Sequence, residues 1–173
     1  GGGTLPAGTS TTNMLNPLMA SANTSVDIPN TMNSIAVRGT WFIKGDKWQF
    51  SDENGKDYYD TWAYIDLSSN PMSQNAEWYR FDEQGNMMTG YYVVGDRTYY
   101  FDDNIANKGT EGKMLVGWHW LPSPDGGDAC YFFFTSAENR GVLVKDSVTR
   151  DGYCVDILGR WCDNGQVQKR SYR

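Results

Sequence analysis

The side chains in this sequence that most clearly suggest a binding function are its aromatic rings. The 173 residues include 7 Trp, 11 Tyr and 7 Phe, and the first of them in the chain is Trp41. A π face attracts a quaternary ammonium ion, which cannot donate a hydrogen bond and is easily dehydrated. Aromatic side chains also stack on sugars, and the stretch Trp118-His119-Trp120 is a candidate platform for a glycan. The rings therefore indicate binding of a cation or a sugar.

The polar side chains give little support for catalysis. His119 is the only histidine, and no Ser-His-Asp or Cys-His arrangement is recognisable. Acidic residues recur where the sequence predicts turns, namely at Asp52, Glu53, Asp82, Glu83, Asp102 and Asp103. Asp is favoured in turns for backbone reasons, and these residues follow a repeat rather than a single cleft. We therefore expect no enzyme activity, no cofactor and no metal site.

The balance of charges limits the partners. Against 15 Lys and Arg stand 21 Asp and Glu, and the resulting net charge of −6 disfavours nucleic acid and anionic membrane surfaces. No apolar run approaches the roughly 20 residues that span a bilayer, and the N-terminus lacks the pattern of a signal peptide. We expect a soluble fragment without membrane insertion, whose export signal was removed or lies outside it.

The aromatic residues lie in a repeated unit. Residues 78–85 (Trp-Tyr-Arg-Phe-Asp-Glu-Gln-Gly) followed by 87–92 (Met-Met-Thr-Gly-Tyr-Tyr) read as one β-hairpin. Residues 98–103 and 48–55 repeat its first half, and residues 112–118 repeat its second half. Since a lone hairpin is marginal in water, successive hairpins must stack. The sequence therefore predicts an all-β solenoid of about five stacked β-hairpins.

Strand alternation assigns the faces of these hairpins. Tyr79 and Phe81 share one face of their strand, and Tyr99 and Phe101 share the corresponding face in the next unit. We expect these four rings to form the core between hairpins. The opposite face of the first of these strands carries the charged Arg80.

Composition divides the chain into three parts. Residues 1–38 contain no aromatic residue and are rich in Gly, Ser, Thr and Asn, which predicts a linker-like segment. Within it, Met14-Leu15 and Leu18-Met19 are candidates for a short helical turn packed on the hairpins. The repeat domain is expected over residues 39–165, and strand pairing is expected to end in the polar tail 166–173.

The three cysteines do not have the close paired spacing of a metal site. Cys154 and Cys162 lie symmetrically about an expected turn at Leu158-Gly159, which predicts a cross-strand disulfide. Cys130 would then be unpaired.

The repeated motifs resemble the bacterial cell-wall-binding repeats, a family that includes choline-binding modules, glucan-binding repeats and the repeat regions of large secreted toxins. The family's unit reads Gly-Lys-Trp-Tyr-Tyr-Phe, then an acidic-Asn-Gly turn, then a Met-rich return that ends in Thr-Gly-Trp. The matching residues here are 77–81 with Gly85 and 89–91, 99–101 with Gly117-Trp118, and more faintly 152–156 with 159–161. The resemblance covers roughly residues 39–165. It implies an exported module on the cell surface, usually attached to a catalytic or adhesive domain.

The resemblance also implies ligand sites. In choline-binding members an aromatic cage combines the first Trp of one unit, the Trp after the Thr-Gly, and the third aromatic residue of the next unit. In this chain the complete cage would be Trp78, Tyr91 and Tyr100. A single cage of three rings gives roughly millimolar binding, so that retention on a wall needs several sites acting together.

The neighbouring junctions depart from the family pattern. Before the predicted hairpin of residues 78–92, Trp48 and Trp62 would be joined by Arg80, a fixed cation that should repel choline. After it, Thr98 replaces the cage Trp beside Trp118. The predicted ligand-binding residues are Trp48, Trp62, Trp78, Tyr91, Tyr100, Trp118 and Trp120.

The expected function is non-catalytic attachment to the cell wall from an extracellular position. The partner would be a cell-wall polymer, either choline-substituted teichoic acid or a wall glycan. The alternative is a structural spacer or protein-interaction repeat whose cages have decayed, and self-association is a further option. Titration with choline and with wall glycans separates these functions.

Overall fold

In the described part of this chain the regular elements are strands, apart from one 3₁₀ turn. The structure, a computed structural model, describes residues 28–70, 75–104 and 109–170. Its elements are η1 (Thr31–Asn33), β1 (Gly39–Lys44), β2 (Lys47–Asp52), β3 (Thr61–Asp66), β4 (Ala76–Phe81), β5 (Gly90–Val94), β6 (Arg97–Phe101), β7 (Gly117–Pro122), β8 (Asp128–Phe133), β9 (Ser147–Val148), β10 (Cys154–Val155), β11 (Trp161–Asp163), β12 (Gln166–Val167) and β13 (Lys169–Arg170). The predicted all-β fold is confirmed. Among the described residues, no helix has the length and apolar character that a membrane crossing requires.

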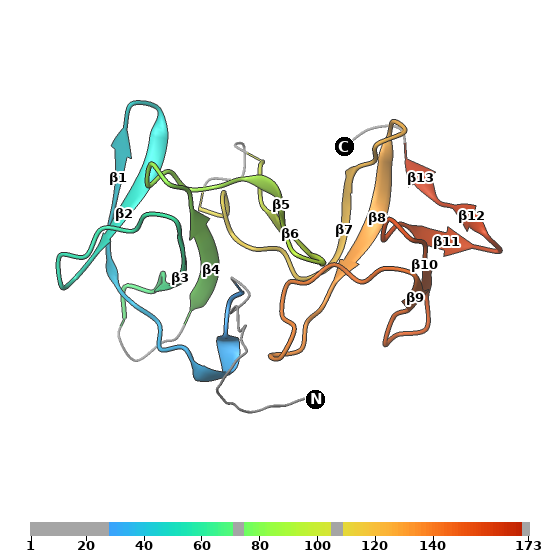
Figure 1. The fold of residues 1–173 in the computed structure, drawn as a ribbon, viewed down its shortest axis with the longest axis horizontal. Helices are drawn as coiled ribbons and strands as arrows, with labels where there is room; N and C mark the ends of the chain where they lie inside the picture. Colours follow the sequence, from blue (N-terminus) through green and yellow to red (C-terminus); the bar gives the residue numbers. More distant parts are fainter. Residues whose placement is uncertain (1–27, 71–74, 105–108, 171–173) are drawn as a thin grey trace.

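Four antiparallel hairpins follow one another along the long axis of the molecule (Figure 1). They are β1–β2, β3–β4, β5–β6 and β7–β8, and we call them the first to the fourth hairpin. A sheet of β9 to β12 forms the fifth repeat. The tight turns of the first and third hairpins contain Gly45 and Gly95, whose φ angles are 69° and 59°. Such turns need positive φ angles, which glycine adopts without strain.

The repeat boundaries differ from the predicted ones. The sequence predicts one hairpin over residues 78–92, but Met87 makes only a single bridge to Phe81. The amide of Met87 donates to the carbonyl of Trp48 in the first hairpin, at 2.8 Å. The chain then enters β5, which pairs forward with β6. Residues 87–92 therefore do not form the second strand of the predicted hairpin. Met87 is bound to the first hairpin, and the residues from Gly90 onward pair within the third.

Connectors join the hairpins and stack on one another. We use this term for residues 53–60, 82–89, 102–116 and 134–146, of which 105–108 lie outside the described part. Each later connector places a glycine so close to a large side chain of the preceding connector that a Cβ atom would collide with it. The pairs are Gly85 on Tyr59, Gly112 on Met87, Gly141 on Met114 and, from the β10–β11 turn, Gly159 on Leu143. These four glycines have φ angles between 84° and 89°.

Backbone hydrogen bonds add a second tie between units. The donors are the amides of Met87, Met114 and Leu143, and the acceptors are the carbonyls of Trp48, Trp78 and Thr98, at 2.8, 3.0 and 2.8 Å. Each donor lies in the connector after one hairpin, and its acceptor lies in the hairpin before that one. A residue such as Met87 thus links three consecutive units.

The core lies between hairpins, on the face that strand alternation predicts. Tyr79 and Phe81 pack against residues of the first hairpin. Tyr99 and Phe101 pack in the next cluster, with Trp78 of the second hairpin. All four predicted core rings are buried, and each contributes on the order of 1.5–3 kcal/mol. This part of the prediction is confirmed.

The N-terminal segment reaches the array before the first strand. Val37 forms a parallel bridge with Ile65 of β3. The end of the segment predicted as linker-like, residues 1–38, is therefore held on the second hairpin. The helical turn predicted at Met14-Leu15 and Leu18-Met19 lies outside the described residues.

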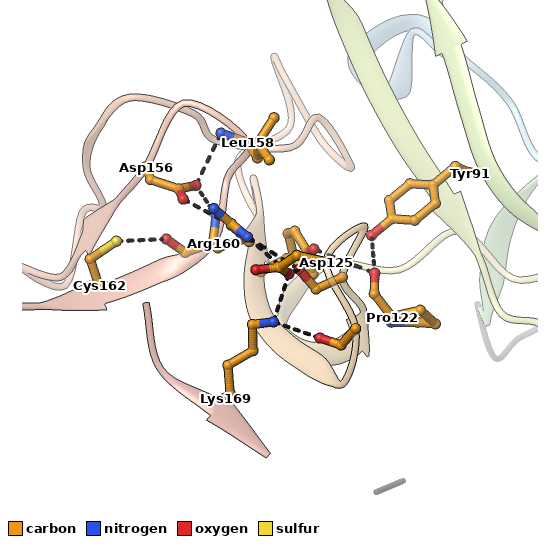
Figure 2. Close-up of polar contacts among 11 residues, drawn as sticks. Tyr91, Pro122, Asp125, Asp156, Leu158, Arg160, Cys162 and Lys169 are labelled. Atoms are coloured by element: carbon orange, nitrogen blue, oxygen red, sulfur yellow. Dashed lines mark hydrogen bonds and ion pairs between the residues drawn. The ribbon is translucent and has the colours of Figure 1, made fainter. Parts of the chain in front are cut away.

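Strand pairing continues beyond Gly165, contrary to the prediction of a polar tail. β12 pairs with β11, and β13 returns to pair with β8. Lys169 Nζ lies 2.6 Å from Asp125 Oδ1, and Arg160 Nη1 lies 3.2 Å from the same oxygen (Figure 2). The hydrogen bond from Lys169 is the main reason why the pKa of Asp125 lies well below its usual range. Within the described residues 166–170, Lys169 thus finds a charged partner in the β7–β8 turn.

The predicted positions of two cysteines are confirmed, but the predicted disulfide between them is not. Cys154 and Cys162 lie opposite each other on β10 and β11, as predicted. The predicted disulfide is absent, since both are free cysteines, and the Cys162 thiol donates to the Arg160 carbonyl at 3.5 Å. Cys130 is also free, and burial raises the pKa of its thiol to about 11.

The glycine contacts predict a selective loss of stability. We expect Gly141→Ala to lower the free energy of unfolding by about 2–4 kcal/mol, because the new methyl group collides with Met114 in addition to straining the backbone. Gly95→Ala is the matched control, since Gly95 also has a positive φ angle but has open space where a Cβ would lie. It should cost about 1–2 kcal/mol. Chemical denaturation measures both, and equal losses would contradict the stacking of connectors.

Candidate functional site

Each junction between consecutive hairpins repeats one arrangement of side chains. One residue comes from the first strand of a hairpin, one from its second strand, and one from the second strand of the next hairpin or its equivalent. The sets are Trp41, Trp48 and Tyr79 at the first junction, Trp62, Trp78 and Tyr99 at the second, Tyr91, Thr98 and Tyr131 at the third, and Trp118, Cys130 and Tyr153 at the fourth. The junctions differ in which rings are present and in whether they are accessible.

The first junction is an open cavity of about 770 Å³. The centroid of the Trp41 ring lies 6.5 Å from that of Trp48 and 4.9 Å from that of Tyr79, with interplanar angles of 87° and 66°. Met87 also lines the cavity. Trp48 is 37% exposed, so a ligand can reach it from solvent. Steeply inclined rings form a corner, a shape that surrounds a compact cation.

The aromatic wall of this cavity is electrically neutral. Burial raises the pKa of Tyr79, so its phenol stays protonated at neutral pH. Neutral π faces attract cations through their quadrupole. Among the described residues that line the cavity, the charged ones are Glu111 and Lys113, which come from the third connector.

The second junction has the same three rings but is closed. Trp62 lies 6.1 Å from Trp78 and 4.9 Å from Tyr99, with interplanar angles of 87° and 70°. Trp78 is only 6% exposed. Tyr64 stacks on its ring at 4.7 Å, and Thr31 Oγ1 accepts a hydrogen bond from its Nε1 at 2.9 Å. The N-terminal segment therefore helps to cover this junction.

A cation of the protein itself lies at the second junction. Arg80 is 5% exposed and stands opposite Trp62 in the β3–β4 ladder. The sequence predicts it beside both Trp48 and Trp62, but it is not among the residues that line the cavity of Trp48. Its guanidinium carbon lies 5.2 Å from the centroid of the Tyr92 ring, and its Nη2 donates to Asp60 Oδ1 at 2.9 Å. Because like charges repel, a ligand cation is disfavoured here.

The third and fourth junctions each lack one ring. Tyr91 lies 6.3 Å from Tyr131, and both hydroxyls donate to the Pro122 carbonyl, at 3.4 Å each; Figure 2 shows this contact for Tyr91. The position of Trp48 is taken by Thr98 at the third junction.

At the fourth junction the corresponding position is Cys130. Trp118 lies 5.8 Å from Tyr153 at an interplanar angle of 89°, and its Nε1 donates to Asp151 Oδ2 at 2.9 Å. Two rings and a carboxylate thus meet at the surface between the fourth and fifth repeats.

The predicted cage is not assembled as one group. Tyr91 and Tyr100 are brought together, with ring centroids 4.5 Å apart. Trp78 packs instead in the cluster of Tyr99, whereas Tyr100 lies in the cluster of Tyr131. Consecutive strand residues point to opposite faces, so Trp78 and Tyr100 lie on different sides of the third hairpin.

The other predicted residues are distributed over the junctions. Trp48 lies at the first, Trp62 at the second and Trp118 at the fourth. Trp120 packs 6.4 Å from Trp161 and lies under the guanidinium of Arg170 at 5.1 Å. A role of these residues in binding stays a prediction.

Sequence reasoning missed two rings of the open junction, Trp41 and Tyr79. A local signal for Trp41 exists, because it precedes Gly45 by four residues as Tyr91 precedes Gly95. Tyr79 was assigned to the core, which is correct, but a core ring of one hairpin also forms the wall of the junction with the previous one. The strand pattern alone does not reveal this second role.

The described residues contain no group of three His, Cys, Asp or Glu side chains placed to hold a metal ion. His119 Nε2 lies 2.7 Å from the Val116 carbonyl and is therefore engaged by the backbone.

Known proteins resemble this chain in structure. No protein-family model matches the sequence, and no curated protein is significantly similar to it. Choline-binding protein F from Streptococcus pneumoniae is 27% identical, with a TM-score of 0.52 and coverage of 72% of this chain and 34% of that one. A further structure of that protein was determined in the presence of a peptidoglycan analogue. CbpJ from Streptococcus pneumoniae TIGR4 is 26% identical, with a TM-score of 0.50 and coverage of 72% and 34%. This chain spans about a third of their length.

The buried arginine leads to a stability prediction. We expect Arg80→Met to lower the free energy of unfolding by about 1–3 kcal/mol, because the cation–π contact with Tyr92 and the hydrogen bond to Asp60 are lost. Arg150→Met removes the same charge at an exposed position and should change stability by less than about 0.5 kcal/mol. Thermal and chemical denaturation provide the comparison. If both variants lose the same free energy of unfolding, the contacts of Arg80 at the junction do not contribute to stability.

Proposed function

We propose that this chain, whose hairpin repeats belong to the cell-wall-binding repeat family of the choline-binding proteins, is a non-catalytic attachment module. It holds a larger protein on the outside of the cell by binding a wall polymer. The ligand group is the quaternary ammonium of choline carried by that polymer, and the site is the first junction, formed by Trp41, Trp48 and Tyr79.

The observation that carries this proposal is the open aromatic corner of the first junction. Three rings line one cavity, and Trp48 is accessible from solvent. The second junction has equivalent rings but is covered by Thr31 and contains Arg80. The first junction thus combines the full set of rings with open access.

The chemistry of the site favours a cation that cannot form hydrogen bonds. Each cation–π contact contributes about 0.5–2 kcal/mol, and the Met87 thioether adds a polarizable, uncharged contact. The net charge of −6 favours the approach of cations to the module. A wall glycan that stacks on Trp48 is the second ligand class compatible with these rings.

The structural relatives support a wall polymer as partner. One is named choline-binding protein F, and a structure of it was determined in the presence of a peptidoglycan analogue; the other, CbpJ, comes from the same organism. A three-ring site gives roughly millimolar affinity, so firm attachment requires several ligand groups on one polymer and several modules.

A structural spacer is the second candidate function. It is favoured by the filled second junction and by the replacement of a ring by Thr98 and Cys130 at the third and fourth. A spacer would show no response to choline or to wall glycans at millimolar concentrations, whereas the proposed module responds to choline.

The site predicts a selective effect of removing one ring. We expect Trp48→Ala to weaken choline binding at least tenfold, because it removes one of the three walls. Phe42→Ala is the matched control: Phe42 belongs to the same hairpin, is also 37% exposed, and points to the opposite face. It should leave choline binding unchanged. Calorimetric titration of both variants with choline measures the effect.

Circular dichroism shows whether each variant retains the fold. A folded Trp48→Ala variant that binds choline as the unmodified chain does would contradict the assignment of the first junction.

A further inference from the structure

Arg80 differs in kind from the residues at its position in the other hairpins. The Arg80 carbonyl accepts a hydrogen bond from the Met88 amide of the following connector, at 2.8 Å. The same bond to the following connector is made by the carbonyls of Phe50, Tyr100 and Phe132 in the first, third and fourth hairpins, at 3.3, 2.8 and 2.9 Å. Among these four hairpins, the second therefore has a planar cation where the other three have an aromatic ring.

The guanidinium of Arg80 has aromatic, anionic and backbone partners at once. Its carbon lies 5.2 Å from the centroid of the Tyr92 ring, and that ring lies 5.8 Å from the Trp62 ring at an interplanar angle of 70°. Nη2 donates to Asp60 Oδ1 at 2.9 Å, and Nη1 donates to the Phe81 carbonyl. Ring faces attract a cation within about 6 Å, and a carboxylate gives a charge-assisted hydrogen bond. These are the partners that a bound external guanidinium would need.

Asp60 pairs with Arg80 from a backbone conformation that is unfavourable for aspartate. Its φ angle is 49°, in the left-handed region that residues other than glycine seldom adopt. Asp146 is the matching residue of the fifth repeat, with a φ angle of 48°. Its amide donates to the Asp156 carbonyl at 2.8 Å, as the Asp60 amide donates to the Asp82 carbonyl at 2.7 Å. Among the ion pairs of the described residues, Asp60 has Arg80 as its partner, whereas Asp146 has none.

We propose that the Arg80 guanidinium, held by Asp60, is an intramolecular ligand of the second junction. It determines which junction admits external cations, because a cation of the protein itself already fills this one. The Arg80 side chain is 6% exposed and that of Asp60 is 64% exposed, so the ion pair runs from the interior to the surface. Truncating Arg80 opens a void that reaches solvent beside Asp60, and this void takes an alkylguanidinium cation.

Rescue by ethylguanidinium tests the cation site. About 10 mM ethylguanidinium should raise the Tm of Arg80→Ala by about 3–5 °C and leave that of the unmodified chain unchanged, because only the variant has a vacant site. Arg38→Ala is the matched control. Arg38 also donates to a carboxylate and to a backbone carbonyl, at 3.0 Å to Asp66 and 2.7 Å to Ser68, but within the described part of the chain it makes no cation–π contact. Its Tm should rise by less than about 1 °C.

A pair of glycine substitutions tests the role of Asp60. Glycine relieves the strain of a positive φ angle at both positions. Asp60→Gly should nevertheless lower the Tm by about 3–6 °C, because it leaves the buried Arg80 cation without its carboxylate. Asp146→Gly, which removes no ion pair, should leave the Tm unchanged or raise it. Differential scanning fluorimetry measures both.

These experiments contain no choline, so their outcome is independent of the ligand proposed for the first junction. Selective rescue of Arg80→Ala supports the inference. Equal rescue of Arg80→Ala and Arg38→Ala, or no rescue of a folded Arg80→Ala variant, overturns it. If Arg80→Ala does not fold, the glycine pair decides: a lower Tm for Asp60→Gly than for Asp146→Gly supports the inference, and an equal or higher Tm overturns it.

Discussion

The contact between a connector glycine and a large side chain of the preceding connector is the constraint on which this array depends. Four such contacts recur, from Gly85 on Tyr59 to Gly159 on Leu143. Hydrogen bonds such as that from Met87 to Trp48 fix the connector to an earlier hairpin. Because each contact links consecutive units, the array extends without one central core, as repeat proteins do.

The same backbone arrangement gives junctions with different properties. The ring distances at the first two junctions agree closely, 6.5 and 4.9 Å against 6.1 and 4.9 Å. Access and charge differ, since Thr31 and Arg80 occupy the surroundings of the second but not of the first. Ligand binding in this fold is therefore decided by a few side chains at each junction, while the solenoid geometry stays constant.

The sequence predicts what depends on local spacing. Alternation places Tyr99 and Phe101 in the core, and the repeat predicts stacked hairpins; the structure confirms both. The sequence did not show that Met87 would pair with the first hairpin, or that β13 would return to β8, because these contacts join segments far apart in the chain. For the same reason, the residues of the predicted cage are divided between two clusters, with Trp78 in one and Tyr100 in the other. Strand alternation assigns Trp78 and Tyr100 to faces, but it does not say which neighbouring hairpin each face meets.

A crystal structure of the chain with bound choline tests the central claim most directly. The account predicts ligand density between the rings of Trp41, Trp48 and Tyr79, with Thr31 still covering Trp78. Density between Trp62, Trp78 and Tyr99, or beside Tyr91 and Tyr100, with the first junction empty at saturating choline, would contradict it.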